Sequence, residues 1–140
     1  MLPRHARMRR SEDFRRTVRH GVRAGRRTVV VHALRAEAVD ADGEGPTGQP
    51  SSDSSVVGFV VSKAVGTAVR RNRVRRRLRH LCQHHLQALA QPTLVVVRAL
   101  PPAGTAGAEL GEDLDAAWLA ALAKLERSGM PERTGKPGRR

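Results

Sequence analysis

The chain has 140 residues, and its 26 Lys and Arg outnumber its 13 Asp and Glu, so the formal net charge is +13. Aromatic residues make up only 2% of the chain, which excludes an RNA-binding sheet that depends mainly on stacked aromatic side chains. No apolar run approaches the roughly 20 residues that span a bilayer, and the single cysteine, Cys82, excludes an internal disulfide. This composition predicts one cytoplasmic domain, without a membrane segment, that binds a polyanion such as nucleic acid.

The first half of the chain predicts one helix and two strands. An acidic first turn after Ser11 and a terminal Gly21 predict a helix of about three turns. Residues 28–36 and residues 56–62 are rich in β-branched side chains, which are typical of strands. Between the two strands, residues 40–55 are rich in Asp, Gly, Pro and Ser, and they predict a flexible acidic loop inserted into the domain.

The second half predicts a long helix, a third strand and a final helix. Residues 68–90 place apolar side chains at helical spacing, and residues 93–97 are again typical of a strand. An amphipathic stripe over residues 110–125 predicts the final helix, and the polar residues 128–140 predict a disordered basic tail. The order of elements predicts an α+β domain, residues 1–127, in which helices pack on one small sheet.

The strongest functional signal is the basic segment at residues 63–79, which holds one lysine, seven arginines and no acidic residue. On a helix, Asn72 and Arg76 project away from the apolar Val74, and Arg79 lies on their side. A solvated helix face would mix acidic and basic residues, whereas like charges at these spacings repel one another and destabilise the free helix. Because the guanidinium fork binds phosphate in a bidentate manner, the segment predicts a surface for a nucleic-acid backbone.

Two further sets of side chains invite a metal or acid–base interpretation, and neither predicts a site. Cys82 and His85 share the apolar face of the long helix whereas His84 points elsewhere, and no fourth ligand is near, so we expect no zinc site. The acidic residues at 12, 13 and 109–115 suit the first turns of two helices, so we expect no catalytic residue in this chain.

Two short sequence motifs, one around the basic segment and one near the start of the chain, are specific enough to compare with known families. A strand ends in Ser62-Lys63, and it is followed by Gly66-Thr67-Ala68-Val69 and then by Arg71-Asn72-Arg73-Val74-Arg75-Arg76. Near the start of the chain, Glu12-Asp13-Phe14 is followed seven residues later by Gly21. In these motifs the chain resembles, from about Arg9 to Leu125, the bacterial ribonuclease P protein subunit, the protein component of the tRNA 5′-processing ribozyme.

The resemblance implies a single-domain α+β fold with a small mixed four-stranded sheet, elements in the order αβββαβα and a left-handed βαβ crossover (ribosomal protein S5 domain 2-like). It also implies an endoribonuclease subunit whose catalytic centre lies outside the protein. In that family an RNA subunit, with Mg²⁺, removes the 5′ leader of precursor tRNA and so forms the mature tRNA 5′ end. The protein binds the catalytic RNA subunit and the leader, and the resemblance implies neither an obligate protein partner nor a membrane.

The resemblance also assigns residues to the two RNA contacts. For RNA binding, either to the catalytic RNA subunit or along the cleft, the matching positions are Lys63, Arg70, Arg71, Asn72, Arg73, Arg75, Arg76 and Arg79. For a leader cleft between the central sheet and the first helix, the matching positions are Phe14, Val18, His32 and Lys63. The family usually places aromatic side chains where this chain has Val18 and His32, so we expect leader binding to depend more on charge than on stacking.

Two other classes of protein fit part of this pattern. A ribosomal protein that packs ribosomal RNA, without a processing role, would share the sheet-and-helix architecture and the basic surface. A helix-turn-helix DNA regulator would also present a basic helix, but the strands predicted on both sides of that helix argue against it. Sedimentation with ribosomes, with no effect on precursor tRNA, would favour the ribosomal protein.

Overall fold

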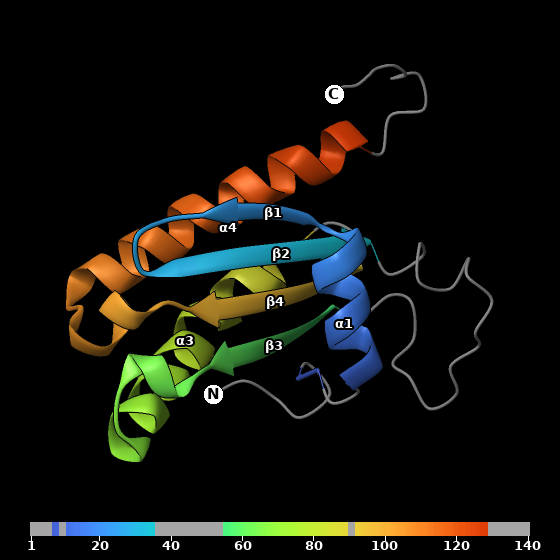
Figure 1. Cartoon of the computed structure of the whole chain (residues 1–140). Coiled ribbons are helices and arrows are strands. Elements are labelled where there is room, and N and C mark those ends of the chain that lie inside the picture. The colour runs from blue at the N-terminus through green and yellow to red at the C-terminus, as the bar shows by residue number, and fades with distance from the viewer. Residues whose placement is uncertain (1–6, 9–10, 36–54, 90–91, 129–140) are drawn as a thin grey trace.

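The computed structural model describes residues 7–8, 11–35, 55–89 and 92–128 (Figure 1). In chain order, the elements within these residues are helix α1 (Ser11–His20), strands β1 (Val22–Gly25), β2 (Val29–Arg35) and β3 (Val56–Val61), the 3-10 turn η2 (Lys63–Val65), helix α3 (Ala68–Gln87), strand β4 (Thr93–Ala99), the 3-10 turn η3 (Pro101–Thr105) and helix α4 (Ala108–Ser128).

The four strands form one mixed sheet in the order β1-β2-β4-β3. Strand β2 pairs antiparallel with both β1 and β4, whereas β3 runs parallel to β4 and is joined to it by α3. Figure 1 shows α1 in front of the sheet and α3 behind it, with β3 and β4 both pointing left and β4 above β3. This arrangement is a left-handed βαβ crossover, as expected from the family resemblance, although about 98% of such units are right-handed.

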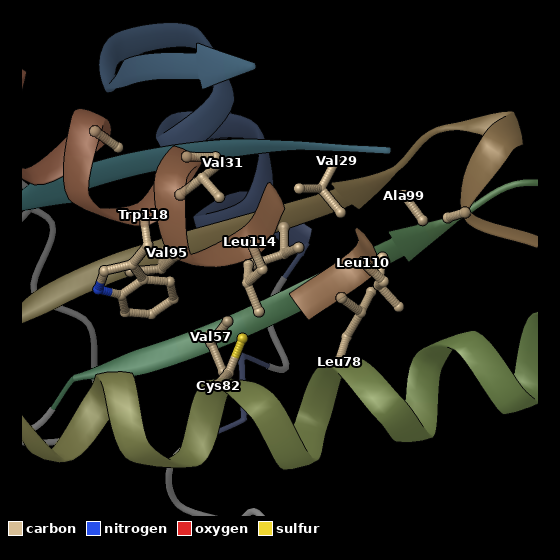
Figure 2. Packing of buried hydrophobic residues seen from close by; sticks show 14 of the residues in the cluster. Val29, Val31, Val57, Leu78, Cys82, Val95, Ala99, Leu110, Leu114 and Trp118 are labelled. Carbon is tan, nitrogen blue, oxygen red and sulfur yellow. The ribbon is translucent and has the colours of Figure 1, made fainter. Parts of the chain in front are cut away.

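The main core lies between the sheet and the two long helices. Leu78 and Cys82 of α3 point toward Leu110 and Leu114 of α4 and toward the sheet, and all four are fully buried (Figure 2). The opposite face of the sheet is covered by α1, so β2 and β4 are buried on both faces. Burial on both faces explains why these strands are nearly continuous runs of β-branched residues rather than alternating ones.

A smaller apolar cluster lies on the α1 side of the sheet. Its buried members are Met8, Leu34, Val56, Leu94 and Val96, and the partly buried Phe14 and Val60 pack against them. The ring of Phe14 lies directly over Gly58 of β3, where a methyl group would overlap the ring. The absence of a side chain at Gly58 therefore determines how closely α1 approaches the sheet.

Each helix and strand predicted from the sequence is confirmed, with small changes at the ends. Strand β1 is the one element whose position the sequence did not predict, because it has four residues and only Ala24 among them is buried. The predicted acidic loop lies outside the described residues except Ser55, whose hydroxyl accepts a hydrogen bond from the backbone N–H of Thr93 at 3.0 Å. The predicted tail also lies outside them, apart from Ser128, which is the last residue of α4.

Candidate RNA interface

The start of α3 is held in place by a glycine-containing loop. Gly66 has a φ of +150°, in the region that favours glycine, and a side chain there would press against Arg70. Thr67 then caps the helix, because its hydroxyl accepts a hydrogen bond from the backbone N–H of Arg70 at 3.2 Å. A methyl group on Gly104 would overlap the carbonyl oxygen of Val65, so η3 packs closely on η2 and fixes the loop.

The predicted RNA-binding residues lie on α3, the helix that buries Val74, Leu78 and Cys82, except Lys63, which lies in η2. Arg70, Asn72, Arg73 and Arg76 are exposed, whereas Arg71, Arg75 and Arg79 are partly buried. Within the described residues, none of these arginines forms an ion pair with a carboxylate. We call this set the α3 arginine surface: Arg70, Arg71, Asn72, Arg73, Arg75, Arg76 and Arg79. Its charge is therefore available to an external polyanion.

Hydrogen bonds hold three arginines of this helix in position. The Nε of Arg71 donates to the carbonyl oxygen of Gly66 at 3.2 Å, and Nη1 of Arg75 donates to Oδ1 of Asn72 at 3.3 Å. Arg77 differs from the others, because its two terminal nitrogens donate to the carbonyl oxygens just before α4, at 2.8 and 2.7 Å. Arg77 thus ties α3 to the start of α4.

Arg79 is the most perturbed arginine of the surface. Burial lowers its pKa below the ordinary value, and the positive charges of Arg7 and Arg75 lower it further. Its Nε is enclosed and has no hydrogen-bond partner among the residues that the structure describes. Arg7 precedes α1 and pairs with Val57 at the free edge of β3, so the fold brings it to α3 from a distant part of the sequence. A phosphate near these three guanidinium groups would relieve their mutual repulsion.

The four residues assigned to the leader cleft are not equally placed. Phe14 packs on Gly58, Val18 of α1 is 37% exposed, and His32 of β2 is 6% exposed on the same side of the sheet. Lys63 is exposed and follows the end of β3, whereas α1 crosses the sheet near the start of that strand (Figure 1). The fold therefore brings Phe14, Val18 and His32 to one side of the sheet and places Lys63 at its other end.

Two arginines that the sequence interpretation missed lie beside His32. Arg23 of β1 is paired directly with His32 on the neighbouring strand. Arg98 of β4 is paired with Val30, so it is a diagonal neighbour of His32 on the same face of the sheet. Burial lowers the pKa of His32, and the charges of Arg98 and then Arg23 lower it further. Strand alternation would have placed both arginines on this face if the position of β1 and the strand pairing had been known.

The lowered pKa of His32 gives the stability of the protein a defined pH dependence. The unfolded chain takes up a proton near the ordinary pKa of 6.5, whereas the folded chain binds it only at lower pH. We therefore expect the free energy of unfolding to fall between about pH 7.5 and 5.5, and to fall less in His32→Phe. Urea unfolding at both pH values measures the free energy of unfolding of each protein. If that free energy fell equally in the wild type and in His32→Phe, the pH dependence would not come from His32.

The acidic side chains mostly serve as structural contacts. Asp113 accepts hydrogen bonds from the N–H and hydroxyl of Thr28 at 3.1 and 2.8 Å, and Glu109 pairs with Arg27 at 3.0 Å. Within the described ranges, no three His, Cys, Asp or Glu residues gather in a way that could hold a metal ion. The structure thus uses these carboxylates at the junction of the sheet with α4.

The side chains considered for zinc are parts of the core and its rim. Cys82 is fully buried, and its burial raises the pKa of the thiol. His85 stacks on Trp118 with ring centroids 4.9 Å apart, and its Nε2 lies 2.7 Å from Oδ1 of Asp115. His84 is exposed. None of the helices within the described residues combines the length and the apolar character needed to cross a membrane.

Comparison with known proteins identifies the family. The model of the family described as Ribonuclease P matches residues 2–122. A ribonuclease P protein component from Streptomyces bikiniensis is 56% identical over 118 residues, which are 84% of this chain and 92% of the relative. Another, from Salinispora tropica, is 50% identical over 133 residues, which are 91% of this chain and 98% of the relative.

Solved structures with the same fold are also ribonuclease P proteins. The protein from Staphylococcus aureus matches with a TM-score of 0.66 at 23% identity, and the match covers 86% of this chain and 96% of that one. The protein from Thermotoga maritima matches with a TM-score of 0.51 at 22% identity, over 85% and 93% of the two chains. The basic helix, the sheet that carries it and these relatives together show that the chain belongs to the family of ribonuclease P protein components and takes part in tRNA processing by ribonuclease P.

Proposed function

We propose that this chain binds the catalytic RNA subunit of ribonuclease P through the α3 arginine surface, and that the hydrolytic centre lies in that RNA. The observation that carries the proposal is the concentration of arginines on one helix without a carboxylate partner among the described residues. Arginines three and four residues apart repel one another in the free protein. Phosphates of a folded RNA would remove this repulsion and would release counterions, which favours binding.

We further propose that the 5′ leader of precursor tRNA lies on the sheet face beside α1, with Lys63 at the far end of β3. Among the four assigned residues, the ring of Phe14 is the larger stacking surface, the imidazole of His32 is a weaker one, and Val18 offers none. Arg23 and Arg98 add positive charge on the same face, next to His32. Charge rather than stacking is therefore the main contribution of this face to leader binding.

The proposal assigns the Mg²⁺ ions of the reaction to the RNA. The described residues offer no cluster of metal-binding side chains, whereas RNA phosphates are ligands of the type that Mg²⁺ prefers. The protein would contribute fixed positive charge, which lowers the concentration of Mg²⁺ that the RNA needs. We place the complex in the cytoplasm, where its proposed RNA partners are made, and propose no membrane contact and no obligate protein partner.

Reconstitution tests this function. The purified protein alone is expected to leave precursor tRNA intact, and the RNA subunit alone is expected to cleave poorly at low Mg²⁺. Adding the protein to the RNA at that Mg²⁺ concentration should restore cleavage at the mature 5′ end. If the RNA cleaved equally well with and without the protein, or if the protein cleaved by itself, the proposed division of roles would be wrong.

A further inference from the structure

A groove between α3 and α4 is lined in part by Arg76 and Arg79 of the α3 arginine surface, but its apolar lining has no role in the function proposed so far. Its volume is about 560 Å³, which falls in the range of small-ligand sites. Its lining residues come from both helices: Arg76, Arg77, Arg79, His80 and Leu81 of α3, and Ala108 and Gly111 of α4. Because α3 lies behind the sheet and α1 in front of it, the groove is separate from the face proposed for the leader (Figure 1).

The groove combines an apolar floor with a positively charged rim. Leu81, Ala108 and Gly111 offer carbon atoms, whereas Arg76 and Arg79 bring guanidinium groups that have no carboxylate partner among the described residues. Within the described part of the chain, the enclosed Nε of Arg79 has no hydrogen-bond partner. An occupant therefore needs an apolar surface of moderate size and a negative charge beside it.

Gly111 keeps the groove open although the packing of the helices does not require a glycine. A β-carbon at this position would lie 3.5 Å from Cδ2 of Leu81, which is an ordinary contact. The φ of Gly111 is not positive, since Gly66 is the only described residue with a positive φ. Glycine inside a helix weakens it relative to alanine. The missing side chain thus leaves room beside Leu81, although it lowers the stability of helix α4.

The rim also has a fixed part. The guanidinium of Arg77 donates to the carbonyl oxygens of Ala106 and Gly107, so the start of α4 is held against α3 by charge-assisted hydrogen bonds. Arg76 is exposed and makes no hydrogen bond within the described part of the chain. The groove is therefore formed before an occupant arrives, and the exposed Arg76 lies at its edge.

We propose that this groove receives one unstacked nucleotide of the RNA subunit, with the base against Leu81, Ala108 and Gly111 and the adjoining phosphates at Arg76 and Arg79. A nucleotide combines the two required features, because a base has flat apolar faces and its backbone is anionic. The inference rests on the proposed binding of the RNA subunit. It adds that the groove between α3 and α4 recognises an unstacked nucleotide of that RNA, in addition to the charge of its phosphates.

Filling the groove tests the proposal without removing charge. Gly111→Leu places a side chain where the base would lie, and Ala123→Leu adds a similar side chain at an exposed position of the same helix. Gly111→Leu is expected to bind the RNA subunit about tenfold more weakly, within the range for loss of one base contact, whereas Ala123→Leu should bind as the wild type does. The dependence of log affinity on log salt should be unchanged, because the phosphate contacts remain.

Chemical probing of the RNA gives a second readout. One nucleotide protected by the wild-type protein should become reactive with Gly111→Leu, while the rest of the protected region is retained. Equal affinity and an identical protection pattern for Gly111→Leu and wild type would overturn the groove proposal alone. Failure of the wild-type protein to bind the RNA subunit would instead overturn the proposed function.

Photocross-linking provides an independent test that does not depend on the folding of Gly111→Leu. His80 is exposed and lines the groove without being one of the proposed contacts to the base or the phosphates, so p-azidophenylalanine is introduced there. In the reconstituted complex with precursor tRNA, this residue should cross-link to a single site in the RNA subunit. Cross-links to the leader, to a second copy of the protein or to no RNA at all would each contradict the proposal.

Discussion

Replacing Arg73 and Arg76 together with alanine is expected to weaken binding of the RNA subunit by about 100-fold, since each charge-assisted contact contributes about 1.5 kcal/mol or more. Both side chains are exposed, and within the described residues neither forms a hydrogen bond or an ion pair. The fold should therefore remain intact, with an unchanged urea midpoint. Filter binding against the RNA subunit at several salt concentrations provides the measurement.

The salt dependence separates charge from shape in this experiment. If the wild type neutralises about six phosphates, log affinity falls by roughly five units for each tenfold rise in salt, and the double variant should show a slope shallower by about 1.8. Arg26→Ala combined with Arg127→Ala removes the same net charge from exposed positions outside α3 and serves as the control. A control that binds as weakly as the α3 variant would show that overall charge, not this surface, holds the RNA.

The largest effect on stability is expected from Trp118→Ala. Trp118 is 2% exposed and stacks on His85, so its removal leaves a large cavity between α4 and the sheet (Figure 2). Such truncations cost about 3–5 kcal/mol, a large share of the 5–15 kcal/mol that is typical of a domain. The free energy of unfolding in urea should fall by that amount.

A neighbouring residue on the same helix provides the control for Trp118. Leu119 is 64% exposed, and Leu119→Ala should change the free energy of unfolding by less than about 0.5 kcal/mol. A loss below about 1 kcal/mol for Trp118→Ala would mean that the core relaxes around the missing ring. Saturating RNA subunit should recover part of the lost stability, because the proposed RNA surface requires the folded helix α3 and the RNA would therefore bind the folded protein more tightly than the unfolded chain.

The regular elements could be predicted because their signals are local. The helical spacing of Val74, Leu78 and Cys82 indicated α3, and the β-branched run at 93–97 indicated β4. Strand β1 has no such signal, because it is short and most of it is exposed. The segment between β1 and β2 includes Thr28, which is hydrogen-bonded to Asp113, a residue far along the chain.

The proposed site was predictable to a similar extent. Helical geometry placed Asn72, Arg76 and Arg79 opposite the apolar face of α3, with Arg73 and Arg75 on its flanks. The structure leaves Asn72, Arg73 and Arg76 exposed, whereas Arg75 and Arg79 are partly buried. It could not show that Arg79 is partly enclosed, or that Arg7 lies close enough to lower the pKa of Arg79. These relations depend on which segments the sheet brings together.

The sequence by itself determined the fold class, the basic helix and the family, because periodicity and motif spacing act over a few residues and one helix turns at a constant rate. Only the tertiary structure decided which distant side chains meet. It placed Arg23 and Arg98 around His32 and formed the groove between α3 and α4. The physical reason is that these contacts depend on which strands pair and which helices pack together. A sequence pattern over a few residues does not specify those partners, because they lie far apart in the chain.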